Sequence, residues 1–192
     1  MRRLTYFVAS TIDGFVAGPE GEYDFLAAVG DHMETVLAEY PETLPAQARG
    51  PLGIADAPNR RFDTVLMGRA TYEVGLPFGV TSPYPHLRQY VVSGSMTAKP
   101  DPEVELVPGD PLEFVRELKR QDGAGVWLCG GGRLAGSLRT EIDELVVKIN
   151  PVVAGAGVPL FAGGFAPQAY DVTEVRTHKS GVLIVTYARR ED

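Results

Sequence analysis

The sequence predicts an α/β protein with a mixed, mostly parallel sheet that ends in an antiparallel hairpin. Strand-like apolar runs alternate with helical segments along most of the chain, which is typical of parallel strands joined by helices. Residues 170–189 instead read as two strands joined by a turn at 179–181. With 192 residues, 44% of them hydrophobic, we expect one domain over 1–192 with a substantial core.

The first third of the chain contains one clear strand and one weakly patterned region. Residues 4–10 are apolar enough for a buried strand, and a loop rich in Gly and acidic residues follows at 11–25. A helix is predicted over 26–40. Residues 41–61 are rich in Pro and Gly without a clear period, so we expect an irregular excursion or lid there.

The middle of the chain returns to regular structure. Strands are predicted at 63–68 and 88–93, with a short helical piece between them that begins at Arg69. The helix within 109–123 has the clearest end signals, because an Asp-Pro pair opens it and a glycine can close it. We expect Asp110 to be its N-cap residue and Glu113 to complete a capping box.

Two further strands are predicted at 125–129 and 145–149, before the C-terminal hairpin. Between them, three consecutive glycines at 130–132 end one strand and open a short helix. Glycine is the costliest residue to order, so three in a row predict an unusual bend or a close approach.

Composition excludes several classes of protein. The formal net charge of −7 argues against binding to a nucleic-acid backbone, so we expect a small-molecule partner. No apolar segment is long enough to cross a bilayer and the start lacks a signal-type pattern, which predicts a soluble, cytoplasmic protein. Cys129 is the single cysteine, which excludes an internal disulfide, and the three histidines lack metal-ligand spacing.

The glycines at 130–132 have two interpretations. A strand-to-helix junction leaves backbone N–H groups free to bind phosphate, but a tight packed turn would also need glycine. The contiguous glycines do not match the dinucleotide fingerprint. A second junction, where Gly68 ends a strand and Arg69 and Thr71 follow, could add donors around a pyrophosphate, or could hold only a surface charge and a helix cap.

A third strand end, at 91–96, carries small hydroxyl residues. Three such strand ends predict an extended, phosphate-bearing ligand of dinucleotide size lying across the edge of the sheet.

Five segments together resemble the dihydrofolate reductase-like superfamily. Within it, the chain is more similar to the reductase domain of the bifunctional riboflavin-biosynthesis deaminase-reductase and its stand-alone bacterial relatives. The resemblance implies a three-layer fold with helices on both faces of the sheet, NADPH as hydride donor to a reducible heterocycle, and a homodimer. The segments are VASTIDGFVAG (8–18), VLMGRATYE (65–73), VVSGS (91–95), LCGGGRL (128–134) and PVVAGAGVPLF (151–161).

Carried over by position, the resemblance implies the cofactor contacts. It places Gly68, Arg69, Ala70 and Thr71 at the cofactor phosphates, Ser93, Gly94 and Ser95 at the adenosine end, Gly130, Gly131, Gly132, Arg133 and Leu134 at the pyrophosphate and nicotinamide ribose, and Ala9, Val16 and Ala17 at the nicotinamide. It also implies a cis peptide bond between Gly130 and Gly131. No acidic residue lies in the turn at 93–95, so we expect NADPH to be preferred over NADH.

The substrate side is less constrained by the pattern. Asp24 is the nearest counterpart of the substrate carboxylate in the folate enzymes and the candidate catalytic residue, or it simply caps a helix. Tyr23 and Phe25 could stack on a planar substrate, or pack in the core. We expect Asp13 to form a turn, and we do not expect Cys129 to be a nucleophile.

Three functions remain open. The first is an NADPH-dependent reductase of a pteridine- or pyrimidine-like substrate. The second is a nucleotide-binding protein that keeps the fold without catalysis. The third is a genuine dihydrofolate reductase, although the loop after the first strand lacks the Pro-Trp pair of those enzymes. The chain also lacks the zinc-binding motifs of a deaminase domain, which excludes a complete bifunctional enzyme.

Overall fold

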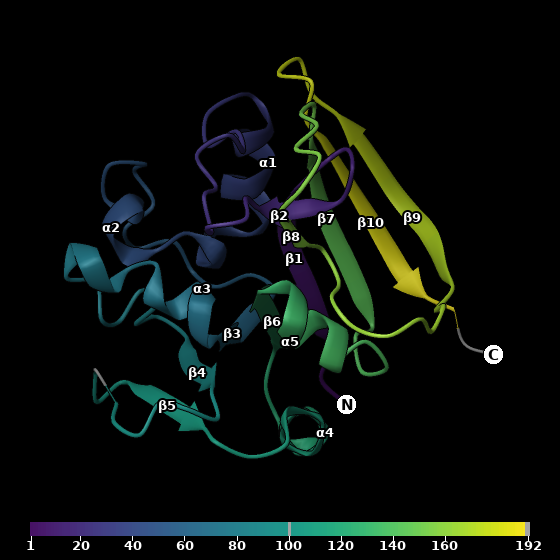
Figure 1. Ribbon diagram of the computed structural model, residues 1–192. Coiled ribbons are helices and arrows are strands. Elements are labelled where there is room, and N and C mark those ends of the chain that lie inside the picture. Colours follow the sequence, from purple (N-terminus) through teal and green to yellow (C-terminus); the bar gives the residue numbers. More distant parts are fainter. Residues whose placement is uncertain (100, 191–192) are drawn as a thin grey trace.

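Figure 1 shows a computed structural model of the protein, which describes residues 1–99 and 101–190. Its centre is an eight-stranded sheet in the order β5-β4-β3-β6-β1-β7-β10-β9. In that order the strands are β5 (Val104–Val107), β4 (Arg88–Val92), β3 (Phe62–Gly68), β6 (Gly125–Gly130), β1 (Leu4–Thr11), β7 (Glu144–Asn150), β10 (Leu183–Arg189) and β9 (Tyr170–Thr177).

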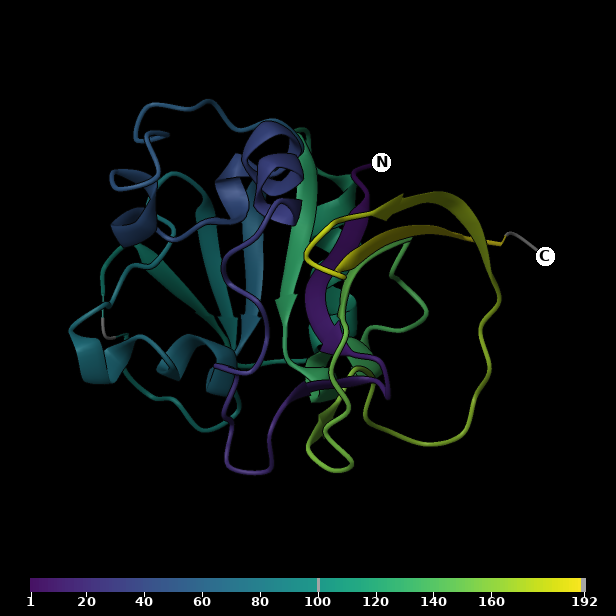
Figure 2. The ribbon, with the colours of Figure 1, turned by 90° about the horizontal axis from the view of Figure 1, so that it is seen from above.

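The six strands from β5 to β7 are parallel to one another, β10 is antiparallel to its neighbour β7, and the edge strand β9 is antiparallel to β10. The central strand β1 pairs with β6 on one side and with β7 on the other, so that Tyr6 lies between Leu128 and Leu145. Figure 2 shows the β9–β10 hairpin bending away from the parallel strands. The predicted fold class, a mostly parallel sheet with a C-terminal antiparallel hairpin, is confirmed.

Helices cover both faces of the sheet and produce three layers (Figure 1). Helices α1 (His32–Glu39) and α3 (Arg69–Glu73) pack on one face, and α4 (Pro111–Arg120) and α5 (Gly132–Ser137) pack on the other. The remaining elements are short: helices η1 (Pro41–Thr43), α2 (Ala46–Arg49) and η2 (Leu76–Phe78), and a separate two-stranded sheet of β2 (Phe15–Ala17) and β8 (Val158–Pro159).

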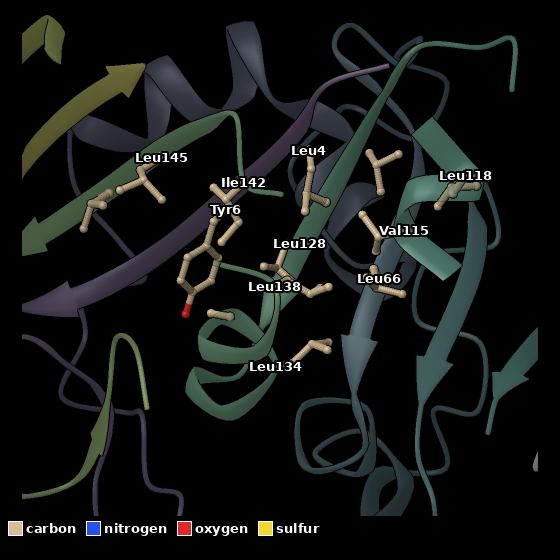
Figure 3. Close-up of a cluster of buried hydrophobic side chains, with 13 residues drawn as sticks. Leu4, Tyr6, Leu66, Val115, Leu118, Leu128, Leu134, Leu138, Ile142 and Leu145 are labelled. Atoms are coloured by element: carbon tan, nitrogen blue, oxygen red, sulfur yellow. The ribbon is translucent and has the colours of Figure 1, made fainter. Parts of the chain in front are cut away.

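Each face of the sheet has its own hydrophobic cluster, because side chains alternate along every strand. On the face of α4 and α5, Tyr6 and Leu128 pack against Val115 and Leu138, as Figure 3 shows. On the face of α1 the buried side chains include Phe7, Val36, Tyr40, Tyr72 and Trp127. Trp127 is buried in this cluster, and its Nε1 donates to the Phe7 carbonyl at 3.1 Å.

The predicted helix at 26–40 is too long, because α1 begins only at His32. Gly30 has a φ of 147°, which a helix cannot accommodate. Asp31 then accepts hydrogen bonds from the backbone N–H groups of Lys179 and Ser180, in the turn of the distant β9–β10 hairpin. This long-range contact fixes residues 26–31 as a loop, and local sequence patterns do not reveal it.

Residues 41–61 contain two short helices, so the expectation of an irregular excursion holds only in part. Two buried charged side chains anchor the segment. The Glu42 carboxylate accepts the backbone N–H groups of Arg61 and Phe62 at 2.6 and 2.8 Å, and Arg49 donates to the carbonyls of Pro41 and Ala57, both at 2.7 Å. The excursion is thereby fixed against the start of β3.

The start of α4 follows the sequence signals closely. Asp110 is the N-cap residue and its carboxylate accepts the Leu112 N–H at 2.9 Å, with Pro111 at the first helical position. Glu113 lies in the first turn. Within the described residues its carboxylate accepts no hydrogen bond from the Asp110 N–H, so the capping box is not complete. Strand β5 at one sheet edge and the β2–β8 pair were not predicted, because they are too short for a clear alternation.

None of the helices within residues 1–99 and 101–190 has the length and apolar character needed to cross a bilayer. In the same residues, no group of three or more His, Cys, Asp and Glu side chains is placed to hold a metal ion.

Candidate functional site

A cavity of about 510 Å³ opens at the carboxyl ends of β1, β3 and β6. In parallel α/β sheets this edge is where ligands bind, because loops leave the sheet there and backbone groups point outward. Side chains and backbone from β2, α3 and the η2 region complete the walls. None of the residues lining the cavity carries a charged side chain, so its walls are apolar and aromatic with a few hydroxyl and backbone groups.

The two glycine junctions predicted from sequence meet at this edge. Gly68 ends β3 at the start of α3, and Gly130 ends β6 beside it; a Cβ added to Gly68 would lie 3.4 Å from the Gly130 carbonyl oxygen. A Cβ on either Gly130 or Gly131 would lie 3.5 Å from the Thr71 hydroxyl. The predicted cis peptide bond between Gly130 and Gly131 is present. Ala70, Thr71, Gly130 and Gly131 all line the cavity.

The third glycine of the run has a packing role. A Cβ on Gly132 would lie 2.0 Å from the Pro159 carbonyl oxygen, and a Cβ on Gly136 would lie 1.6 Å from that of Ala162. The chain at 158–162 therefore crosses α5 at a distance that only glycine permits. The Gly132 carbonyl also accepts the Ala162 N–H at 2.9 Å. Gly132 and Gly136 thus fix the segment that places Val158 in the cavity wall.

The loop after β1 forms another wall of the cavity. Val16 and Ala17, both predicted to face the nicotinamide, line the cavity from β2, which pairs with β8. Asp13 holds this loop against the segment after β7, because its carboxylate accepts the N–H groups of Ala154 and Gly155 at 3.1 and 2.7 Å. Hydrogen bonds from the Thr11 hydroxyl and from these N–H groups lower the Asp13 pKa to about 2.

Asp13 lies in the turn after β1, as expected. The two backbone N–H groups that its carboxylate accepts belong to a loop about 140 residues further along the chain.

The remaining predicted cofactor residues do not line the cavity. Ala9, Gly68, Arg69, Ser93, Gly94, Ser95, Gly132, Arg133 and Leu134 are outside its wall. The Arg69 side chain is 52% exposed and 3.9 Å from the Glu73 carboxylate. Ser93 is buried and its hydroxyl already accepts the N–H groups of Ser95 and Met96. Leu134 packs in the core, so only its backbone is available to a ligand.

The three predicted substrate residues are placed differently from one another. Tyr23 lines the cavity with its side chain half exposed. Phe25 is partly buried outside the cavity wall. Asp24 is exposed in a turn, seven residues before the N-cap residue of α1, Asp31, so it does not cap that helix. The carboxylate of Asp24 does not line the cavity.

Sequence patterns did not reveal part of the cavity wall. Pro45 and Gln47 come from the 41–61 excursion, and Tyr84 comes from the loop before β4. The Tyr84 ring packs edge-on against Trp127 with ring centroids 4.9 Å apart, and Cys129 also lines the cavity. Burial raises the pKa of the Cys129 thiol to about 12, so the thiol stays protonated and is a poor nucleophile.

Comparison with known proteins places the chain in a family. The family model for the RibD C-terminal domain matches residues 2–184. The uncharacterized protein YwjB of Bacillus subtilis (strain 168) is 28% identical over 162 residues, which are 83% of each chain. Among solved structures, a protein from Shewanella sp. PV-4 assigned to riboflavin biosynthesis superposes with a TM-score of 0.72 at 23% identity, and each chain is covered completely.

Two further structures share the fold at lower sequence identity. A diaminohydroxyphosphoribosylaminopyrimidine deaminase/5-amino-6-(5-phosphoribosylamino)uracil reductase from Thermotoga maritima gives a TM-score of 0.65 at 16% identity; 98% of this chain covers 57% of that protein. Dihydrofolate reductase from Enterococcus faecalis gives 0.63 at 15% identity, with 98% and 97% of the two chains covered. The fold is thus dihydrofolate reductase-like, and the chain belongs to the RibD C-terminal domain family.

Proposed function

We propose that the protein is an NADPH-dependent reductase that transfers hydride to a small heterocyclic substrate, pteridine-like or pyrimidine-like. The observation that carries this proposal is the cavity at the strand ends, which lies between the glycine junctions and the β2 loop. Its volume of about 510 Å³ is within the range of small-molecule sites. Membership of the RibD C-terminal domain family supports a reductase, because the Thermotoga maritima protein of similar fold is named for such an activity.

The residues at the two glycine junctions fit a dinucleotide. Glycines at 130–131 leave the backbone open on the cavity side, since a Cβ there would contact only the Thr71 hydroxyl. The Thr71 hydroxyl and the backbone around Gly68 and Gly131 would hold the pyrophosphate. The half-exposed guanidinium of Arg69 can reach a 2′-phosphate, which favours NADPH over NADH.

The β2 loop and the apolar lining fit the nicotinamide and the substrate. Bound NADPH supplies the hydride, and the protein supplies orientation and exclusion of water. Val16 and Ala17 form one wall, and their position is fixed by pairing with β8 and by the bonds of Asp13. Tyr23, at the edge of the cavity, is placed to cover a planar ring.

The absence of a carboxylate from the cavity wall argues against folate. The folate enzymes that this fold resembles use an acidic residue to support protonation of the pteridine, and every residue lining this cavity is uncharged. Asp24, the sequence-based candidate for that role, would have to move into the cavity to take part. We therefore favour a substrate that is bound through ring oxygens or neutral groups over dihydrofolate.

Loss of NADPH absorbance with a panel of substrates tests the proposal. The panel contains dihydrofolate, dihydropterin and a phosphoribosylaminopyrimidinone. Turnover of a pterin or pyrimidine ahead of dihydrofolate supports the proposal. A preference for dihydrofolate identifies a genuine dihydrofolate reductase. NADPH binding without turnover of any member supports the alternative of a nucleotide-binding protein without catalysis.

We also propose that the protein is a homodimer, as its resemblance to the reductases implies. Edge strand β9 supports this, because Val172 and Val175 are more than half exposed on it. A sedimentation mass equal to two chains at micromolar concentration is expected, and a mass of one chain would contradict the proposal.

A further inference from the structure

Four tyrosines of the described chain line the cavity, and their hydroxyl groups differ in what they bond. Tyr6 and Tyr72 each donate to a backbone carbonyl, at 3.2 and 2.6 Å, so neither hydroxyl is free to donate to a ligand. Tyr23 is 52% exposed, and water competes for its hydroxyl. Tyr84 is partly buried, and within residues 1–99 and 101–190 no nitrogen or oxygen atom of the protein is hydrogen-bonded to its hydroxyl.

The surroundings of Tyr84 hold its ring in one place. The ring centroid lies 4.9 Å from that of Trp127, with the two planes at 77°. The backbone N–H of Tyr84 donates to the Gln89 side-chain oxygen at 2.9 Å, and its carbonyl accepts the Leu87 N–H at 2.9 Å. Gln89 is itself buried and donates to the Ser82 hydroxyl at 2.7 Å. Tyr84 is thus preorganised, so little conformational entropy is lost when a ligand binds to it.

Tyr84 and strand β6 form the same part of the cavity wall. Trp127 and Cys129 are two residues apart on β6, so alternation places both side chains on one face, in the cluster beneath α1. Cys129 lines the cavity there, and Tyr84 lines it from the loop before β4. Burial raises the pKa of the Tyr84 hydroxyl well above its ordinary value, as it does for the Cys129 thiol. Both groups are therefore neutral and protonated at physiological pH.

Other polar side chains of the described wall are less suited to bind a substrate ring. The Thr71 hydroxyl lies beside Gly130 and Gly131, where we place the pyrophosphate. Gln47 is exposed on α2, so water competes for its amide. A thiol is only a weak hydrogen-bond donor, whereas a phenol is a strong one. Tyr84 is therefore the residue of this wall that can donate a strong hydrogen bond to a substrate.

We propose that Tyr84 is a specificity-determining residue: its hydroxyl donates a hydrogen bond to a ring carbonyl oxygen and thereby selects oxo-heterocycles over their amino analogues. This inference rests on the proposed reductase function and deepens it. An amino group in place of the carbonyl oxygen could only donate to the phenol oxygen. The phenol proton would then lack an acceptor, which costs free energy in apolar surroundings. The hydroxyl binds the substrate and transfers no proton.

A pair of pteridines tests this role. Pterin carries oxygen at ring position 4, 2,4-diaminopteridine carries an amino group there, and both are mainly uncharged at neutral pH. Each is titrated into the protein saturated with NADP⁺, and its fluorescence is followed. Wild type is expected to bind pterin at least about fivefold more tightly. Tyr84→Phe should weaken pterin binding by about three- to tenfold, the effect of one neutral hydrogen bond, and leave 2,4-diaminopteridine within about twofold of wild type.

Tyr90→Phe is the matched control, because it removes the same hydroxyl outside the cavity wall. Tyr90 lies on β4, is partly buried and packs edge-on against Phe114 with ring centroids 5.0 Å apart. This variant should bind both pteridines as wild type does. Urea unfolding separates a binding role of Tyr84 from a structural one. Tyr84→Phe keeps the ring against Trp127, so it should unfold at the same urea concentration as wild type.

The inference is overturned if wild type binds no pterin, or binds it no more tightly than 2,4-diaminopteridine. It is also overturned if Tyr84→Phe keeps wild-type pterin affinity, weakens both pteridines equally or is strongly destabilised. NADPH binding is measured separately by fluorescence. Failure of NADPH to bind refutes the proposed function, whereas NADPH binding with a pterin affinity that is insensitive to Tyr84 refutes only this inference.

Discussion

The crossing of residues 158–162 over α5 predicts that Gly136→Ala is destabilising, although helix propensity favours alanine. In a helix interior alanine is more favourable than glycine by about 1 kcal/mol. The new Cβ, however, would lie 1.6 Å from the Ala162 carbonyl oxygen, where 3.4 Å is an ordinary contact. Because the obstacle is backbone, relief requires the segment to move, and overpacking of this kind costs about 1–3 kcal/mol. At the upper end of that range, the net loss is about 2 kcal/mol.

Urea unfolding measures this loss, and a fall in Tm of roughly 4–8 °C should accompany it in a chain of this size. Gly109→Ala is the control, because a Cβ there meets nothing within 4 Å and the residue is exposed; its stability should change by less than about 0.5 kcal/mol. The displaced segment carries Val158, so the variant should also bind NADPH more weakly. Stability of Gly136→Ala equal to or above wild type would refute the reasoning.

Three further perturbations test separate parts of the structure. Glu42→Ala leaves the backbone N–H groups of Arg61 and Phe62 without an acceptor and should lower the unfolding free energy by about 2–4 kcal/mol in urea. Glu42→Gln keeps an acceptor oxygen and should lose less; equal losses for the two variants would contradict the role of this side chain as a hydrogen-bond acceptor. Burial lowers the His32 pKa below 6.5, so the unfolded chain binds the proton more readily, and the unfolding free energy should decline as pH falls below about 6.5. His32→Asn should show a shallower decline than wild type, and an identical pH profile of the two proteins would contradict this role of His32. Arg69→Ala should weaken NADPH binding by roughly 1.5–3 kcal/mol in calorimetry, and an unchanged Kd would leave Arg69 as a surface charge.

The parts of the fold that the sequence predicted correctly are those fixed by local interactions. Strands such as β3 and β7 are rich in apolar residues, and their ends fall within one or two residues of the prediction. Asp110 caps α4 through a hydrogen bond two residues away, which is a purely local contact. The glycine junctions were recognised because few other structures need glycine at the end of a buried strand.

The parts that were missed depend on contacts between distant residues. The start of α1 is set by Asp31 bonding to a hairpin almost 150 residues later, and the 41–61 excursion is fixed by Glu42 and Arg49, whose types suggest exposure. Lys148 lies within a predicted strand, but only the packing of β1, β7 and β10 shows that it is partly buried. The close approach that requires Gly132 likewise comes from Pro159.

A crystal structure with NADP⁺ tests the central claim most directly. The account predicts the nicotinamide in the cavity against Val16 and Ala17, and the pyrophosphate along the backbone at 130–134 with Thr71 beside it. It also predicts the 2′-phosphate within reach of Arg69. Dinucleotide bound elsewhere on the molecule, or a cavity that stays empty at saturating NADP⁺, would contradict the assignment of this edge of the sheet as the reductase site.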